Sequence, residues 1–155
     1  MVIGGLLKGY RRGRYFVDRT LLSNAASNLS TEPDGLFVSW ESFKSGRVRQ
    51  VQGTEDCVEI EGTPDFTLEV VSPSSVRKDT IVLRDLYWSA GIPEYWLVDA
   101  RGGRLVFDIL RRGPNGYAKT RKRGGWVESR VLGKSFKLSR HRDEVGNPEY
   151  TLAVK

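Results

Sequence analysis

The segment PDFTLEVVS, from Pro64 to Ser72, decides how the chain folds and carries its most unusual charge. Its apolar and β-branched residues predict a buried β-strand over residues 65–71. Two carboxylates, Asp65 and Glu69, interrupt that apolar run. An ionised carboxylate in a core strand is costly unless it is paired or bound. We therefore expect Glu69 to meet a cation.

Side chains alternate along a strand, which divides this segment into an apolar face and a semi-polar face. The apolar face holds Phe66, Leu68 and Val70, and the semi-polar face holds Asp65, Thr67, Glu69 and Val71. Four residues separate the two carboxylates, or roughly 13 Å at about 3.3 Å per residue. That is too far for both to bind one metal ion directly, so a second ligand for Glu69 has to come from a neighbouring element.

Asp34, in the sequence EPDGLFV, is the candidate for that second ligand. It stands at the start of a strand predicted over residues 36–40, and pairing of the two strands would bring it beside Glu69. Two carboxylates, with waters and a phosphate oxygen, suit Mg²⁺. The alternative is that the aspartates sit in turns or at a strand edge, where Asp after Pro is common, and that Glu69 pairs with an arginine.

The clearest predicted helix lies in residues 72–93, SPSSVRKDTIVLRDLYWSAGIP. Its serines are cap candidates, and Gly91 followed by Pro93 is a stop signal. An apolar stripe at helical spacing consists of Leu83, Leu86, Tyr87 and Ala90. The next strand is predicted over residues 94–99, where Tyr95 and Trp96 pack in the core while Glu94 and Asp99 face solvent or pair with arginine.

The flanking regions predict less regular structure. Residues 1–17 are typical of the tail of a helix, residues 18–35 of a loop, and residues 41–63 of a turn, a hairpin arm and a mobile loop. A strand over 104–110, a turn into YAKT and short antiparallel strands follow. The chain is therefore expected to be one domain over residues 1–155, of mixed α+β (α/β) class, with a mixed sheet, a crossover helix and C-terminal antiparallel hairpins.

Charge points to a polyanionic partner. The 155 residues include 25 Lys and Arg against 19 Asp and Glu, a net charge of +6. The basic residues cluster within residues 8–14, 110–113, 119–125 and 139–142. Such clusters, interleaved with aromatic residues, suit nucleic acid, although a surface that is merely basic is the alternative. One cysteine and the lack of a long apolar run predict a cytoplasmic protein with no membrane partner.

The motifs PDGLFV, GTPDFTLEVVSPSS and KDTIVLRDLYWSAGIPEYWLVD, at this spacing, resemble the Uma2 family (DUF820) of endonucleases, which have the restriction-endonuclease-like, PD-(D/E)xK fold. The similarity runs from about Tyr15 to Tyr150. It implies a restriction-endonuclease-like core in which Asp34, Asp65 and Glu69 are catalytic and hold Mg²⁺ or Mn²⁺. It also implies a lysine that polarises the scissile phosphate or the attacking water, and a longer N-terminal helix than residues 3–14 provide.

The chain departs from the family pattern at that lysine. Val71 occupies the position two after Glu69, and Leu83 occupies the helical position, four after Asp79, where the family commonly places it. Lys78 is the candidate replacement near the helix start, although at about 100° per residue it does not share the face of Leu83. A solvated surface cation is the alternative reading of Lys78.

These observations predict a Mg²⁺-dependent DNA endonuclease that contacts the DNA backbone without sequence preference and works as a homodimer. Its predicted catalytic residues are Asp34, Asp65, Glu69 and Lys78. The alternative is a catalytically degenerate protein that binds nucleic acid or a protein partner without cleavage. A hydrolase acting on sugars is less consistent with the sequence. His141 is expected at the surface or on a phosphate, and Cys57 is not expected to be a nucleophile.

Overall fold

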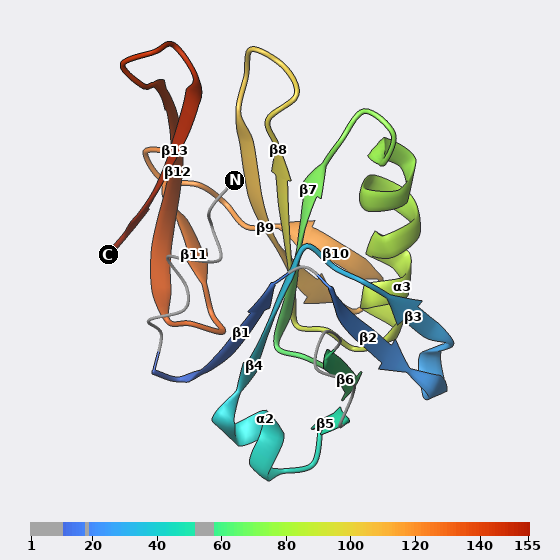
Figure 1. Ribbon diagram of the computed structural model, residues 1–155. Coiled ribbons are helices and arrows are strands. Elements are labelled where there is room, and N and C mark those ends of the chain that lie inside the picture. The colour runs from blue at the N-terminus through green and yellow to red at the C-terminus, as the bar shows by residue number, and fades with distance from the viewer. Residues whose placement is uncertain (1–10, 18, 52–57) are drawn as a thin grey trace.

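The computed structural model describes residues 11–17, 19–51 and 58–155 (Figure 1). Within them, a central six-stranded sheet runs in the order β1-β4-β7-β8-β9-β10. Its strands are β1 (Gly13–Val17), β4 (Gly35–Ser39), β7 (Phe66–Val71), β8 (Glu94–Asp99), β9 (Val106–Gly113) and β10 (Gly116–Lys119). β7 and β8 are parallel, and the other neighbours are antiparallel. The sheet is therefore mixed, as predicted.

The helix that joins β7 to β8 covers one face of this sheet. It begins with a π-helical segment, η2 (Lys78–Val82), and continues as α3 (Leu83–Ser89). Leu83, Tyr87 and Ala90 of the predicted stripe are buried, while Leu86 is partly buried. The crossover helix expected between the two parallel strands is thereby confirmed.

A second sheet, in the order β3-β2-β6-β5, lies beside that helix in the view of Figure 1. It consists of β2 (Thr20–Asn24), β3 (Leu29–Thr31), β5 (Val48–Val51) and β6 (Val58–Gly62), with a 3₁₀ turn, η1 (Ala25–Ser27), and a short helix, α2 (Trp40–Lys44), between its parts. The prediction of a loop over residues 18–35 was wrong. Leu22 and Leu29 are buried in a shared core, and their burial stabilises the strands β2 and β3 despite the polar residues beside them.

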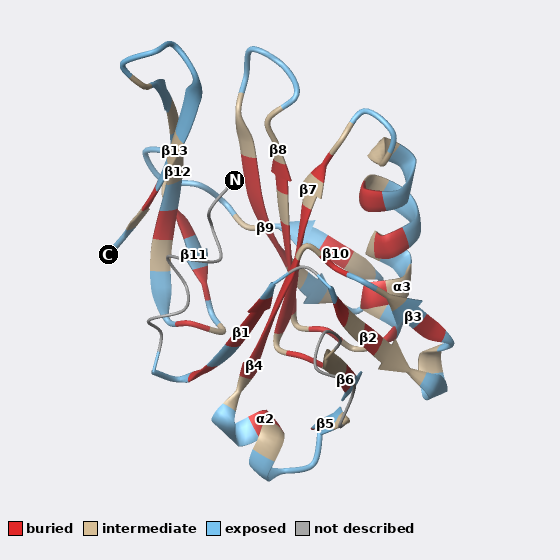
Figure 2. Ribbon diagram, in the orientation of Figure 1, coloured by how far each residue is buried: buried red, intermediate tan, exposed pale blue. Residues whose placement is uncertain are grey.

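The other face of the central sheet is covered by an antiparallel sheet at the C-terminal end, β11 (Val127–Ser129), β12 (Lys134–Arg142) and β13 (Pro148–Val154). Its buried side chains pack on Phe66, Trp96 and Ile109. Phe66 stacks on Trp96 with ring centroids 4.3 Å apart. The predicted C-terminal hairpins are therefore confirmed, and Figure 2 shows buried residues at the centre of β4, β7, β8 and β9.

Two apolar clusters result, one on each face of the central sheet. The alternation of β8 separates them, since Trp96 belongs to the cluster under the C-terminal sheet while Tyr95 belongs to the cluster under the helix. Both side chains have no exposed surface, which confirms their predicted packing. In the part of the chain that the structure describes, no helix is both long and apolar enough to cross a bilayer.

The start of the chain differs from expectation. Residues 1–10, which hold most of the predicted helix tail, lie outside the described residues. Gly13 and Arg14 are in β1, paired antiparallel with β4, and not in a helix. A Cβ at Gly13 would lie 2.2 Å from the carbonyl oxygen of Val38, so glycine lets the two strands approach there. The predicted mobile loop and Cys57 fall largely in residues 52–57, which also lie outside the described part.

Glu94 corrects a second expectation. Its side chain is 2% exposed, and among the described residues it forms no ion pair with an arginine. It accepts hydrogen bonds from Trp96 Nε1 at 2.9 Å, from Ser129 Oγ at 2.8 Å, and from the backbone N–H groups of Arg130 and Val131 at 2.7 and 3.1 Å. A buried carboxylate is stable when its oxygens are satisfied in this way. Asp99 follows the prediction, because its Oδ2 lies 2.7 Å from Arg101 Nη2.

Candidate active site

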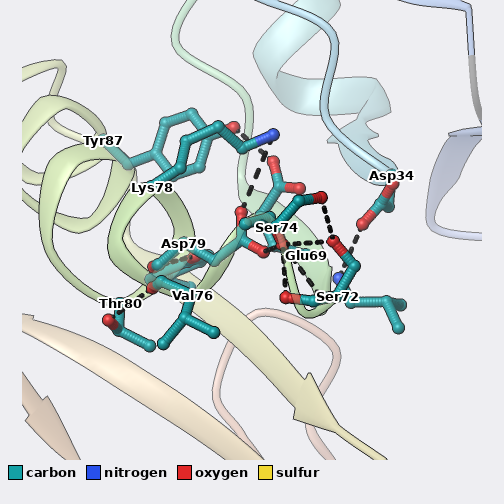
Figure 3. Close-up of polar contacts among 12 residues, drawn as sticks. Asp34, Glu69, Ser72, Ser74, Val76, Lys78, Asp79, Thr80 and Tyr87 are labelled. Atoms are coloured by element: carbon teal, nitrogen blue, oxygen red, sulfur yellow. Dashed lines mark hydrogen bonds and ion pairs between the residues drawn. The ribbon is translucent and has the colours of Figure 1, made fainter. Parts of the chain in front are cut away.

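Asp34 and Glu69 come together through the pairing of β4 with β7. The antiparallel register aligns Gly35 with Leu68, so one further step of the same register brings Asp34 opposite Glu69. Asp34 lies just before β4, and its Oδ2 accepts a 2.6 Å hydrogen bond from the backbone N–H of Val70. The predicted strand pairing is confirmed, and Figure 3 shows both carboxylates in one group of polar side chains.

Glu69 is buried to a degree that changes its chemistry. Only 2% of the residue is exposed, and loss of water around the carboxylate raises its pKa to about 8. The nearby carboxylates of Asp34 and Asp79 contribute to this rise in pKa, whereas the hydrogen bond from Tyr87 and the charge of Lys78 oppose it. A cation at the carboxylate would favour the ionised form, and the site is thus suited to bind one.

Tyr87 of α3 reaches Glu69 directly. Its hydroxyl donates a 2.6 Å hydrogen bond to Glu69 Oε1 inside the protein. Burial and the neighbouring carboxylate raise the pKa of Tyr87 well above its ordinary value, so the hydroxyl keeps its proton and acts as a donor. The helix therefore fixes the orientation of the carboxylate on the strand.

Asp79, in the π-helical segment, is the third carboxylate of this group. It is 1% exposed, and burial raises its pKa. Its Oδ2 accepts a 2.5 Å hydrogen bond from Ser75 Oγ. Its Oδ1 has no hydrogen-bond partner among the described residues, and the nearest cation is Lys78 Nζ at 3.9 Å. This oxygen is buried with its hydrogen-bonding capacity unmet.

The π-helical geometry also places Lys78. The backbone N–H of Leu83 bonds to the carbonyl oxygen of Lys78, an i→i+5 bond that closes a π turn. The two side chains nevertheless differ in exposure, in line with the expectation that they do not share a face. Leu83 is buried, whereas the Lys78 side chain is 57% exposed, with its Nζ beside Asp79. Figure 3 shows the amine on the Glu69 side of the helix.

Asp65 lies apart from this group. Its carboxylate accepts hydrogen bonds from the backbone N–H of Ser39 at 2.7 Å and from the hydroxyls of Ser39 and Ser42 at 3.2 and 3.1 Å. It thus holds the junction of β4 and α2, four residues before Glu69 along the strand. The structure brings together Asp34, Glu69 and Lys78 of the predicted residues, and it does not bring Asp65 to them.

Sequence reasoning missed Asp79, Tyr87 and Ser75 as members of the site. Asp79 could have been found as a carboxylate in the first turn of a helix that follows the Glu69 strand. Tyr87 carried no such signal, because its place in the apolar stripe is typical of a core residue. Ser72, Ser74 and Ser75 were expected to cap the helix, but the N-cap position of the π-helical segment is Arg77 and has no side-chain hydrogen bond. The hydroxyl of Ser75 instead accepts a hydrogen bond from the Ser72 N–H at 2.8 Å.

Other candidates stay outside the site. His141 is at the surface, where its Nε2 lies 3.1 Å from Glu149 Oε2. The expected surface position is therefore found, in contact with a carboxylate. Across the described ranges, no three His, Cys, Asp or Glu side chains gather closely enough to form a metal cage. Mg²⁺ does not require one, since it usually binds one or two carboxylates and completes its shell with waters and phosphate oxygens. Asp34 and Glu69 fit that requirement.

The mixed α+β fold of this chain is shared with a solved structure. A crystal structure described as a putative nuclease belonging to DUF820 from Anabaena variabilis has a TM-score of 0.56 with this chain and 18% sequence identity. The match covers 85% of this chain and 68% of that chain, which shows a shared fold. The chain belongs to the Uma2 family, described as "Putative restriction endonuclease", which it matches over residues 2–140. A comparison with curated proteins gave no match.

Proposed function

We propose that this protein is a metal-dependent DNA endonuclease with its active site at Glu69. The observation that carries the proposal is the buried Glu69 carboxylate, with a pKa of about 8, at the meeting point of Asp34, Asp79 and Lys78. Such a perturbed carboxylate is typical of a functional site. Membership of a family described as restriction endonucleases supports hydrolysis of a phosphodiester.

Asp34 and Glu69 would hold the metal ion, Mg²⁺ or Mn²⁺. When bound, the ion supplies an activated water and neutralises charge on the phosphate. Tyr87 holds the Glu69 carboxylate in one orientation through the 2.6 Å hydrogen bond. Asp34 is held by the N–H of Val70, so both ligands are fixed by the fold before any ion arrives. Asp65 is not part of this set in our proposal.

Lys78 would supply the cation that the family pattern places at the position of Leu83. Its Nζ stands beside Asp79 at 3.9 Å, and its charge lowers the pKa of Glu69. A half-exposed amine at this point can donate to a non-bridging oxygen of the scissile phosphate. Asp79, hydrogen-bonded by Ser75, would keep that amine near the site.

The protein would act in the cytoplasm on duplex DNA as a homodimer, since a two-fold pair of sites faces the two antiparallel strands. The second candidate function is a degenerate family member that binds DNA or a protein partner without cutting. The absence of lysine at positions 71 and 83 and the exposure of Lys78 favour that alternative.

Nicking of supercoiled plasmid in Mg²⁺ or Mn²⁺ tests the proposal. We expect metal-dependent nicking by the wild type that is lost in Glu69→Ala. Asp65→Asn is the matched control, because it alters a carboxylate that lies just before β7 and outside the proposed site, and the variant should still nick. A folded wild type that does not nick in either metal would favour the degenerate alternative.

A further inference from the structure

Positive charge is concentrated in one segment of this chain. Residues 111–137 contain nine Lys and Arg residues and one carboxylate, Glu128, for a formal charge of +8. The whole chain carries +6, so the other 128 residues together are slightly acidic. The segment runs from the end of β9 through β10 and β11 into β12. Such a concentration of like charges lowers the stability of a folded domain through mutual repulsion, so it suggests a function for the positive charge.

Several basic residues elsewhere are used to hold the protein together. Arg140 donates to three backbone carbonyl oxygens of residues 100–103, at 2.9–3.0 Å. Arg12 donates to Leu132 O at 3.3 Å, and Arg142 donates to Gly146 O at 2.8 Å. These guanidinium groups are occupied by the protein itself. Two of the basic clusters in the sequence, residues 8–14 and 139–142, are thus at least partly structural.

Within the charged segment, Arg112 Nε donates to Trp88 O at 2.8 Å and Arg111 Nη2 donates to Glu128 O at 3.3 Å, but four other cations differ from these. Arg121, Arg123, Lys134 and Lys137 are exposed. Across the part of the chain that is described, none of the four forms an ion pair. Lys119 and Lys122 share a single carboxylate, Asp108, at 3.6 and 2.9 Å. The segment therefore presents more positive charge than the protein neutralises.

A groove collects part of this charge. It has a volume of about 370 Å³, and the residues that line it include Arg111, Arg121, Arg123, Trp126 and Lys155. The carboxylate of Glu128 also lines it and lies 3.5 Å from Arg111 Nη2. Four cations thus face one carboxylate. We call this feature the basic groove.

The fold holds the cations of the loop in place. The N–H of Thr120 bonds to Ile109 O at 3.1 Å, which ties the loop to β9. Arg123 and Trp126 exchange two backbone hydrogen bonds of 2.9 and 3.0 Å. The two residues between them, Gly124 and Gly125, have φ of 58° and 80°, as a tight type I′ turn requires. Arg123 is therefore presented from a defined hairpin.

The basic groove and Glu69 belong to opposite faces of the central sheet. In the antiparallel register of β8 and β9, Arg111 lies opposite Glu94. Arg111 shares the sheet face of Ile109, which packs under the C-terminal sheet. Glu69 is aligned with Leu97 and then with Asp108, on the face that carries the helix. The loop over residues 119–123 thus follows the sheet edge, with Lys119 and Lys122 on the Glu69 side and Arg121 and Arg123 on the other.

We propose that the basic groove and the adjoining loop cations, residues 119–123, form a second surface that binds the phosphate backbone of duplex DNA. This inference rests on the proposed function for the identity of the polyanion. Binding along this edge would hold a substrate on the protein through contacts that do not involve Glu69. When unpaired cations of the protein neutralise DNA phosphates, the counterions condensed on the DNA are released, and this release favours binding.

Two observations favour a duplex over other anionic partners. Proteins that bind single strands stack bases on open aromatic rings, but Lys155 Nζ lies 4.4 Å from the centre of the Trp126 ring and covers it. A membrane surface would call for apolar side chains beside the cations, and residues 111–137 contribute none of the large apolar side chains that are exposed in the described chain.

The test measures binding of a fluorescently labelled 20-base-pair duplex by anisotropy, in EDTA and on the Glu69→Gln background, so that cleavage plays no part. The double variant Arg121→Ala/Arg123→Ala is compared with Lys44→Ala/Arg49→Ala, which removes two exposed cations from α2 and β5. At about 0.1 M salt we expect the groove variant to bind about tenfold more weakly. Its plot of log affinity against log salt should be less steep by about 2, with little change in the control.

An equal loss in both double variants, or no loss in the groove variant, would overturn the proposal. So would binding to vesicles that contain phosphatidylserine in the absence of binding to the duplex. The outcome is separable from that for the proposed function. A protein that never nicks plasmid but loses duplex affinity in the groove variant keeps this inference and discards the nuclease. If the protein nicks plasmid but the groove variant binds the duplex as tightly as its parent, the proposed nuclease function stands and this inference is discarded.

Discussion

The hydroxyl of Tyr87 donates a 2.6 Å hydrogen bond to Glu69 Oε1, and this bond joins α3 to β7 at the centre of the candidate active site. Both residues are buried. When Glu69 is ionised, the bond is charge-assisted and therefore stronger. It orients Glu69 and, by lowering the pKa of that residue, makes the ionised form easier to reach.

Tyr87→Phe should therefore shift the pH dependence of the site upward. Without the donor, the pKa of Glu69 rises above about 8, so less of it is ionised at neutral pH. We expect nicking at pH 7 to fall about tenfold, with a smaller change at pH 9. The pH at which Mg²⁺ begins to raise the melting temperature should move upward as well, which needs no cleavage. An unchanged pH profile would mean that the bond does not tune Glu69.

Glu69→Gln should make the metal-free protein more stable at alkaline pH. Burial raises the pKa of Glu69 from 4.5 to about 8 in the folded state, so between these values the folded protein holds a proton that the unfolded chain releases. Stability from the neutral group is complete below pH 4.5 and is lost as pH rises towards 8. The variant avoids this loss, which we put at about 5 kcal/mol at pH 9.

Urea unfolding in EDTA at pH 5 and pH 9 measures that difference. The gain of Glu69→Gln over the wild type should appear at pH 9 and nearly vanish at pH 5. Addition of Mg²⁺ should then raise the free energy of unfolding of the wild type at pH 9 but not at pH 5, because the ion binds the ionised carboxylate. A difference that is the same at both pH values would contradict the raised pKa.

Lys78→Ala tests whether this lysine replaces the one that the family places at position 83. We expect the nicking rate to fall about 100- to 1,000-fold, the usual effect of losing one donor to the developing charge. Duplex affinity should change far less, since one exposed cation contributes a single phosphate contact. Lys44→Ala, which removes an exposed lysine from α2, is the control. Equal rates for the wild type and Lys78→Ala would make Lys78 a solvated cation.

Glu94→Ala should weaken the attachment of the C-terminal sheet. The change leaves Trp96 Nε1, Ser129 Oγ and two backbone N–H groups without their acceptor. We expect the free energy of unfolding to fall by about 3 kcal/mol or more, with faster hydrogen exchange in β11 and β12. Glu144→Ala, at an exposed carboxylate, should change it by less than about 0.5 kcal/mol. Similar effects of the two changes would show that the buried acceptor is dispensable.

The fold was predicted best where hydrophobic periodicity was strong. The apolar run of β7, the stripe of the crossing helix and the buried strand EYWLVD were all recognisable from local pattern. The region from Thr20 to Thr31 was misjudged, because β2 and β3 are short and polar and are held in strands by buried Leu22 and Leu29 and by pairing with β6. Such pairing is non-local, so no window of sequence reports it.

The residues of the candidate site likewise fall into those that local sequence pattern identified and those that it did not. Glu69 was identified from its misplaced charge, and Asp34 from the motif before the strand with which β7 pairs. Asp79 and Tyr87 were not identified, since their roles depend on burial and on contacts that form only when the helix packs on β7, such as the hydrogen bond from Tyr87 to Glu69.

The sequence by itself determined the strand that carries Glu69, the helix that follows it, the family pattern and the excess of positive charge, because these depend on residue type and spacing along the chain. Only the tertiary structure decided which charges meet. It separated Asp65 from Glu69, buried Glu94 under the C-terminal sheet and distinguished structural arginines from unpaired ones. Burial and the distances between groups far apart in the chain set those interactions, and both exist only once the chain has folded.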